Sequence, residues 1–333
     1  IEPIKEGQRV YDTYWLHAMS SYVRERLDLD GAGVLMPVIN QSSVEIGKHQ
    51  NVLQEVNLTL LEAKQIQLLR RRAGGGAIYY DTGCLALWFK APDEGEGQDH
   101  FVRVTEPVVA ALKELGATGI AKTGRHDLTI AGKKVSGTAV VVTDGYAGGG
   151  VSLMLDVDFD TLDEILTPNI KKMKSKGIKS TRSRVTAIRP YLAPEFQTAT
   201  IDEFKNLVLE KLYAVDSVAE IKQYHLTNED WQIIEKDFLP AYQDWEWNYG
   251  ANPKFEYNRD AHFKAGTIEF SLQIAKGRIA ACKIYGDFFG RKEISEVEAA
   301  LIGVRLHRED LLAVFEQLDV PAYFGAVTAA ELV

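Results

Sequence analysis

Cysteine is scarce in this chain of 333 residues, which contains only Cys84 and Cys282. Two cysteines are too few for a disulfide framework or a cysteine-based zinc site, and this fits a reducing compartment. No apolar run approaches the roughly 20 residues that a membrane-spanning helix needs. The first residues, IEPIKEGQ, lack the basic-then-apolar layout of a signal peptide. We therefore expect a cytoplasmic protein with no membrane partner.

Basic residues are also fewer than acidic ones, and the formal net charge is -9. This balance argues against general affinity for nucleic acid. One segment departs from it: from Ile170 to Arg189 there are eight Lys or Arg residues and no acid. Lys, Ser and Gly dominate this basic segment, so we expect a loop that can order over an anionic ligand.

The length and the residue patterns indicate a large and a small domain. Valine-rich and alternating stretches predict strands near 34–39, 44–46, 66–69, 77–80, 85–90, 127–130, 134–142 and 151–157, with helices near 14–23, 58–64 and 102–115. Thr200 with Glu203 and Thr227 with Asp230 predict two further helix starts. A boundary at Asn252-Pro253 would precede a hairpin over 267–285 and two helices, near 295–301 and 308–318.

The stretch from Arg70 to Phe89, RRRAGGGAIYYDTGCLALWF, places arginines before three consecutive glycines and an alternating run. Glycine lets a backbone approach a ligand closely, and bare amides beside Arg70 and Arg71 would form a seat for a phosphate or a carboxylate. Downstream, GKKVSGTA contains Lys134, which should begin the second strand of a hairpin that turns at Ala131-Gly132. Such a position is rigid, as a catalytic charge requires.

Together, RRxxGGGxxxxDxG, GRxD and KVSGxA resemble the motifs of the lipoate-protein ligases, which are relatives of the biotin ligases. The resemblance extends through VEIGKHQN, KGIKSTRSRV and WEWNYG, and so covers nearly the whole chain. It implies an α+β fold with a mixed β-sheet flanked by helices over residues 1–247, and a small α+β accessory domain over 248–333.

The activity implied by the resemblance has two steps. ATP with Mg²⁺ converts lipoate to lipoyl-AMP, and a lysine of an apo lipoyl-domain protein then attacks the carbonyl. The acceptors would be the glycine cleavage H protein or the E2 subunit of a 2-oxoacid dehydrogenase.

The resemblance also implies roles for individual residues, with Lys134 as the catalytic residue. Lipoate and lipoyl-AMP would contact Arg71, Gly74, Gly75, Gly76, Tyr80, Ser136, Gly137 and Gly150. ATP and the adenylate would contact Ile78, Asp81, Cys84, Asp127, Lys134, Lys179, Ser183 and Arg184. Asp127 would orient Lys134 or bind the metal. For an arbitrary lysine, a solvated surface position is the usual outcome, and only the resemblance separates Lys134 from its neighbour Lys133.

Several positions depart from the pattern common in this family. Cys84 stands where many members have Asn, Tyr80 and His126 replace His and Asn, and Gly149-Gly150-Val151 replaces the frequent HHG. These changes concern the acyl pocket and the surroundings of the adenylate, and so they bear on acyl specificity and rate more than on reaction class.

Other functions stay open at this point. An octanoyl or lipoyl transferase of the same fold would use a cysteine thioester and no ATP, and Cys84 would be its nucleophile. A catalytically inactive homologue would bind lipoyl domains without modifying them. A biotin ligase fits less well, because the RRxxGGG and KVSG forms are closer to the lipoate branch.

Overall fold

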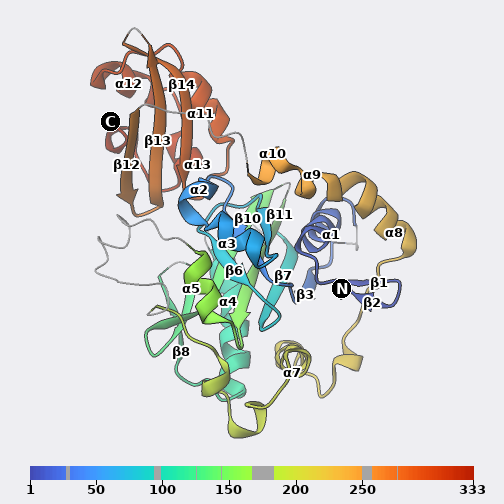
Figure 1. Cartoon of the computed structure of the whole chain (residues 1–333). Coiled ribbons are helices and arrows are strands. Elements are labelled where there is room, and N and C mark those ends of the chain that lie inside the picture. Colours follow the sequence, from blue (N-terminus) through green and yellow to red (C-terminus); the bar gives the residue numbers. More distant parts are fainter. Residues whose placement is uncertain are drawn as a thin grey trace.

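The computed structural model describes residues 1–27, 31–93, 99–124, 126–143, 145–166, 184–249, 257–275 and 277–333. These residues form a large domain and, above it in Figure 1, a small C-terminal domain. The expected basic loop lies mostly outside the described residues, as does the expected boundary at Asn252-Pro253.

A six-stranded antiparallel sheet organises the large domain. In spatial order its strands are β3 (Val34–Val38), β7 (Cys84–Pro92), β11 (Tyr146–Met154), β10 (Lys133–Thr143), β9 (Asp127–Ile130) and β8 (Ile120–Thr123). The expected hairpin at Ala131-Gly132 is confirmed, because β9 and β10 pair directly across this turn. The strand expected near 151–157 is β11, which begins earlier, so the glycines of 148–150 lie inside it.

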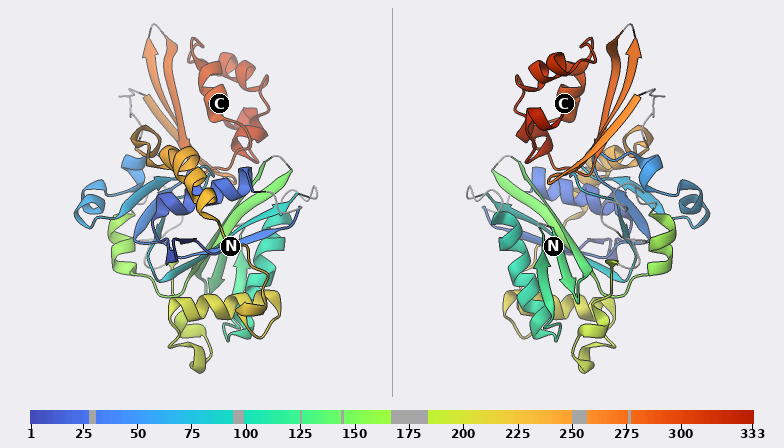
Figure 2. Two further views of the ribbon diagram at one scale, coloured as in Figure 1. Left: turned by 90° about the vertical axis from the view of Figure 1, so that its right-hand side faces the viewer. Right: turned by 90° about the vertical axis from the view of Figure 1, so that its left-hand side faces the viewer.

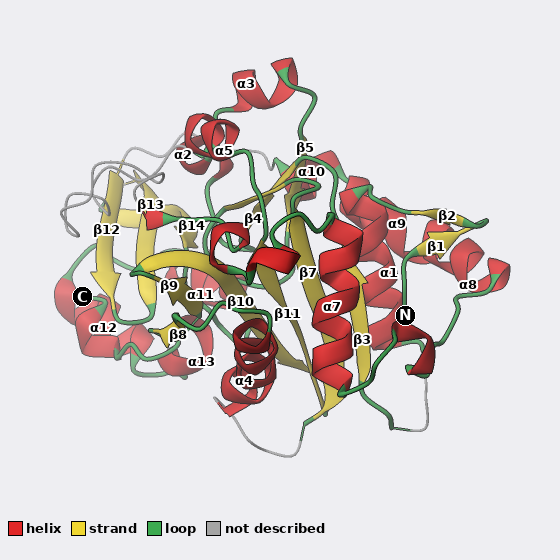
Figure 3. Cartoon of the chain, turned by 90° about the horizontal axis from the view of Figure 1, so that it is seen from below, coloured by secondary structure: helices red, strands yellow, loops and turns green. Residues whose placement is uncertain are grey.

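Each face of this sheet has its own hydrophobic core. Leu85 and Leu87 of β7 point into a core with α4 (Asp99–Glu114) and α7 (Ile201–Tyr213). Ala86 and Trp88 alternate with them and point into a second core with α1 (Thr13–Glu25). Figure 3 shows α4 and α7 next to each other on the viewer's side of the sheet. A strand buried on both faces explains the nearly continuous apolar run of β7.

A smaller mixed sheet packs against the hydrophobic core that contains α1. Its order is β5 (Gln67–Arg70), β4 (Ser43–Ile46) and β6 (Ile78–Tyr80), with β4 parallel to β5 and antiparallel to β6. The strands at 77–80 and 85–90 are therefore not a hairpin: β6 pairs with β4, whereas β7 pairs with β3 and β11. Asp81 lies at the bend between the two strands, where its carboxylate accepts hydrogen bonds from Gly83 N and from the distant Asp158 N.

Short elements connect and cover these sheets. They are β1 (Ile4–Lys5), β2 (Gln8–Arg9), α2 (Val52–Glu55), α3 (Leu58–Ala63), α5 (Phe159–Ile165), η2 (Arg189–Tyr191), η3 (Pro194–Phe196), η4 (Val218–Glu220), α8 (Asn228–Ile233), the π-helical turn η5 (Ile234–Phe238), α9 (Leu239–Gln243) and α10 (Trp245–Asn248). The helix starts expected at Thr200 and Thr227 are confirmed, and both carry complete capping boxes.

The C-terminal domain has a separate core. Strands β12 (Tyr257–Phe263), β13 (Gly266–Ala275) and β14 (Arg278–Gly286) form an antiparallel sheet. Helices α11 (Ile294–Leu301), α12 (Arg308–Phe315) and α13 (Val320–Phe324), with the turn η6 (Ala329–Glu331), pack on one face of it. Figure 2 shows these helices on one side of the sheet, above the large domain.

Candidate active site

A cavity of about 1080 Å³ lies between the six-stranded sheet, α1 and the C-terminal domain. Its lining includes the whole segment from Arg71 to Tyr80, which contains the glycine triplet. Residues of β7, β10 and β11 contribute one face of the central sheet. The cavity therefore lies on the α1 side of that sheet, opposite α4 and α7.

Lys134 faces this cavity from the start of β10. Its Nζ lies 2.8 Å from Oδ1 of Asp127 on the paired strand β9, and 34% of the Lys134 side chain is exposed. Lys134 O also accepts a hydrogen bond from Thr186 N at 2.9 Å. The backbone of Lys134 is thus held from both sides, while its amine is available to a ligand.

The loop after β5 forms part of the cavity wall. Gly75 has φ of +96°, which only glycine adopts without strain. A Cβ at Gly74 would overlap the Phe288 carbonyl oxygen, and a Cβ at Gly47 would overlap that of Gly75. Two of the three triplet glycines are therefore required by the fold, whereas a Cβ at Gly76 would meet nothing within 4 Å.

The two motif arginines donate to backbone carbonyls. Arg71 lines the cavity, but it donates to the carbonyl oxygens of Glu45 (2.7 Å) and Gly76 (2.7 Å). Arg70 donates to Gln50 O at 2.6 Å and Trp247 O at 2.9 Å. Arg71 therefore ties the glycine loop to β4, whereas Arg70 ties residues 47–50 to α10.

Most residues predicted for the site share this cavity. Its lining includes Arg71, Gly74, Gly75, Gly76, Ile78, Tyr80, Cys84, Asp127, Lys134, Gly137, Gly150 and Arg184. Ser136 and Asp81 are not among the lining residues: Ser136 is fully buried, and Asp81 binds backbone amides. Lys179 and Ser183 lie outside the described residues.

Cys84 lies in the cavity wall but is nearly fully buried. Burial, followed by the nearby negative charge of Asp81, raises the pKa of the Cys84 thiol well above its usual range. The thiolate, not the thiol, is the nucleophile in acyl transfer. The environment of Cys84 therefore disfavours the cysteine-thioester alternative.

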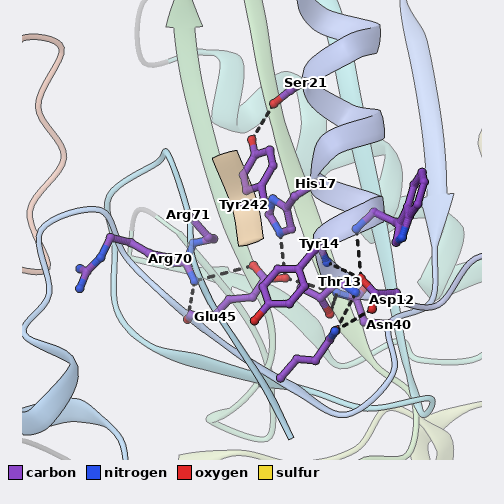
Figure 4. Close-up of polar contacts among 12 residues, drawn as sticks. Asp12, Thr13, Tyr14, His17, Ser21, Asn40, Glu45, Arg70, Arg71 and Tyr242 are labelled. Atoms are coloured by element: carbon purple, nitrogen blue, oxygen red, sulfur yellow. Dashed lines mark hydrogen bonds and ion pairs between the residues drawn. The ribbon is translucent and has the colours of Figure 1, made fainter. Parts of the chain in front are cut away.

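A polar cluster that sequence reasoning missed lies beside α1 (Figure 4). His17 Nε2 is 3.0 Å from Oε1 of Glu45, whose side chain is only 2% exposed. The His17 ring lies 4.6 Å from the Trp88 ring and 5.6 Å from the Tyr242 ring, between centroids. These four side chains line the cavity.

The sequence contained one indication of this cluster, namely the positions of polar residues along α1 and β4. His17, Ser20 and Arg24 follow a helical spacing on α1, and all three line the cavity, whereas Leu16 and Met19 are in the core. Glu45 is a lone acid among the apolar residues of β4. A polar stripe on an otherwise apolar helix, facing a buried acid, is a pattern that indicates a ligand-facing surface.

The C-terminal domain completes the cavity with His262, Lys264, Asp287 and Phe289. Phe289 contacts His126 of the large domain, with ring centroids 4.9 Å apart. The site therefore includes residues from both domains.

Two negative findings concern the part of the chain that the structure describes. Within it, no cluster of at least three His, Cys, Asp or Glu side chains is arranged to hold a metal ion. In the same residues no helix combines the length and apolarity needed to traverse a lipid bilayer.

Comparisons with known proteins agree with this geometry. The sequence model "Lipoyl protein ligase A/B catalytic domain" matches residues 12–213, and "Bacterial lipoate protein ligase C-terminus" matches residues 252–333. The lipoate-protein ligase of Streptococcus pyogenes is 47% identical over 332 residues, covering 100% of this chain and 97% of that protein. Lipoate-protein ligase 2 of Staphylococcus aureus is 42% identical over 333 residues, covering 100% of this chain and 98% of that protein.

The fold agrees as well. The structure of P. falciparum LipL1 in complex with lipoate superimposes with a TM-score of 0.73 at 19% identity, covering 93% of each chain. Both the sequence matches and the arrangement of the two domains lead to one conclusion. The chain belongs to the lipoate-protein ligase family, in the form that carries a C-terminal domain.

Proposed function

We propose that this protein activates lipoate with ATP to lipoyl-AMP and pyrophosphate, and then transfers the lipoyl group to a lysine of an apo lipoyl domain. Membership of the lipoate-protein ligase family makes it a ligase. The observation that supports the individual steps is the location of Lys134, paired with Asp127, in the same cavity as the glycine loop.

The chemistry needs a positive group at this position. A carboxylate is a poor electrophile, so its oxygen attacks the α-phosphorus of ATP, the bond to pyrophosphate breaks, and a mixed anhydride forms. The Lys134 ammonium would stabilise the negative charge that develops on the carboxylate and α-phosphate oxygens. Asp127 would hold the amine in place, because its carboxylate is 2.8 Å away.

The second step releases AMP. The acceptor lysine, as a neutral amine, attacks the carbonyl of the anhydride, loses a proton, and forms an amide as the bond to AMP breaks. Water must be kept from the anhydride until then. The cavity walls supplied by the glycine loop and by Phe289 of the C-terminal domain would provide this shielding.

Mg²⁺ is part of the proposal, and the residues present suit one kind of binding. Mg²⁺ usually takes one or two carboxylates together with substrate phosphates, where it neutralises phosphate charge. Asp127 could supply one such oxygen, and no metal-binding cluster is found in the described residues. We therefore propose a metal held mainly by the nucleotide, with Asp127 as its protein ligand.

One assay tests this function. The purified protein is mixed with ATP, Mg²⁺, lipoate and either apo H protein or an apo E2 lipoyl domain, and the acceptors are examined by intact mass. We expect the mass of one lipoyl group to be added, with pyrophosphate released, only when ATP and lipoate are both present. Acyl transfer without ATP, together with an adduct on Cys84, would contradict the proposal. The acceptor that reacts faster identifies the preferred partner.

A further inference from the structure

Three small residues, Gly137, Ala139 and Gly150, form a lane along the cavity face of the central sheet. Gly150 pairs with both Ala139 and Trp88, and Gly137 lies two residues before Ala139. Two residues along a strand span about 7 Å. A Cβ at Gly150 would meet Trp88 Cδ1 at 2.5 Å, so only glycine leaves this lane open. The lane connects Lys134, beside Gly137, to the aromatic ring of Trp88.

The far end of this lane is the polar cluster of Figure 4. The His17 ring lies near the rings of both Trp88 and Tyr242, and Oε1 of Glu45 is 3.0 Å from His17 Nε2. His17 itself lines the cavity, so its imidazole can meet a ligand there. Tyr242 is fixed by a hydrogen bond of 2.6 Å between its hydroxyl and Ser21 Oγ. The ring positions are thus preorganised.

Glu45 is charged in this arrangement. Burial alone would raise the pKa of its carboxyl group, but His17, Arg71 and Asn40 together lower it below the usual value. His17 Nε2 is the nearer of the two basic groups, at 3.0 Å, whereas Arg71 is 4.0 Å from the carboxylate and donates to the Glu45 carbonyl. The carboxylate thus acts mainly on His17, while the glycine loop is held through backbone oxygens.

We infer that His17, positioned by Glu45, determines acyl specificity, favouring a chain that ends in sulfur over a saturated chain of the same length. This inference rests on the proposed function, because it assigns the lane beside Lys134 to the acyl chain. The residues concerned line the cavity, and the strand pairing separates Trp88 from Lys134 by the length of the lane.

The physical reason is the difference between a sulfur-bearing and a saturated chain end. Sulfur is polarisable, contacts aromatic ring edges favourably and accepts weak hydrogen bonds. A saturated end would cover the His17–Glu45 pair and remove water from it without offering any polar contact in return. The pair thus disfavours octanoate, whereas an apolar pocket would accept both chains.

The test compares lipoate with octanoate in wild type and in His17→Leu/Glu45→Gln. Glutamine keeps an oxygen for the Asn40 amide, which donates to Glu45 at 3.3 Å. We expect the lipoate-to-octanoate ratio of kcat/KM, measured by pyrophosphate release, to fall by about tenfold or more, mainly through better use of octanoate.

His17→Gln supplies an amide N–H as hydrogen-bond donor in place of the imidazole N–H. This variant should keep the ratio within about threefold of wild type.

A second measurement keeps the inference separate from the proposed function. Calorimetry with each acid, without ATP, reports the same preference as a ratio of Kd values and needs no turnover. His17→Phe, which preserves the ring, is the alternative variant if the double variant does not fold. His49→Phe is the matched control, since His49 is a buried imidazole outside the cavity lining.

The two measurements distinguish failure of the His17 specificity role from failure of the proposed ligase function. A Kd ratio that changes less than about twofold in both His17→Leu/Glu45→Gln and His17→Phe would overturn the specificity role, even with full pyrophosphate release. Conversely, wild type that binds lipoate with the expected preference but releases no pyrophosphate would overturn the proposed function and leave the specificity role supported.

Discussion

Gly137 sets the space in which the Lys134 side chain lies. A Cβ at Gly137 would be 3.2 Å from Lys134 Nζ and 3.4 Å from its Cε. These contacts are tight, and the lysine would have to move to relieve them.

We predict that Gly137→Ala displaces the amine and lowers kcat for pyrophosphate release by about tenfold or more, since misplacement by about 1 Å can cost 10²-fold. The melting temperature should change little, because a flexible side chain gives way and not the backbone. Gly119→Ala is a matched control: its Cβ would make an ordinary contact of 3.8 Å with Ile130. Equal activity of both variants would show that the space beside Lys134 is not limiting.

At this scale the sequence predicted the residues that belong to motifs and missed those that do not. Lys134, Asp127 and the glycine triplet stand in recognisable spacings, and the fold brings them to one cavity. His17 and Glu45 come from α1 and β4, and their contact depends on how these elements pack. The roles of Arg70 and Arg71 could not be predicted either, because their carbonyl partners are set by the loop path.

Among the elements, the glycine loop between β5 and β6 is supported chiefly by other backbone segments. Lys48 N donates to Ala73 O at 2.9 Å, and Arg71 N donates to Ile46 O at 2.8 Å. Gly47, between these contacts, approaches the loop so closely that a Cβ would overlap the Gly75 carbonyl. The end of β4 therefore supports the glycine loop through backbone hydrogen bonds and close packing.

We predict that Gly47→Ala lowers the free energy of unfolding by about 1–3 kcal/mol, the usual effect of overpacking, and also weakens lipoate binding. Gly33→Ala, whose Cβ would make a 3.6 Å contact with Lys90 O, should leave both quantities near wild type. Chemical denaturation and calorimetric titration measure the two effects. If Gly47→Ala binds lipoate as wild type does, the loop does not depend on β4 for its shape.

Element types were predictable where local rules dominate. The capping boxes at Thr200 and Thr227 and the turn at Ala131-Gly132 lie where the sequence placed them. Strand pairing was harder, because β6 and β7 have suitable patterns for a hairpin yet belong to different sheets. Local sequence does not encode that choice, because the partners of β6 and β7 are strands far away in the chain.

For the whole molecule, the contact between the two domains includes a buried histidine. The His49 ring stacks on Phe288 with centroids 4.7 Å apart and planes at 8°. Lys48 Nζ is 2.7 Å from Glu293 Oε1 across the same contact. Burial, and then the charges of Lys48 and Arg70, lowers the pKa of His49 to about 3.

This pKa predicts loss of stability on acidification. An unfolded histidine has a pKa of about 6.5, so the unfolded chain binds a proton at His49 below that pH whereas the folded chain does not. The contribution of neutral His49 is fully present above pH 6.5 and declines as the pH falls towards 3, by up to about 1.4 kcal/mol per pH unit. His49→Phe should reduce this slope between about pH 6.5 and 5. An unchanged slope in urea unfolding would show that His49 is hydrated in the folded protein.

The sequence indicated two units but not how they meet. The separate core of β12–β14 follows from its own hairpin and helix patterns. Phe288 contacts His49, and Phe289 contacts His126. Both contacts join residues far apart in the chain, so no local sequence pattern predicts them.

The central claim is that the Lys134 amine stabilises the charge formed during adenylation. Its most direct test is lipoate-dependent pyrophosphate release by Lys134→Ala, with Lys133→Ala, an exposed neighbour, as control. We predict a fall of about 10²-fold or more for Lys134→Ala, comparable to losing an oxyanion-stabilising group, with an unchanged melting temperature and near-normal activity of Lys133→Ala. Retention of more than about a tenth of wild-type activity by Lys134→Ala would contradict the account.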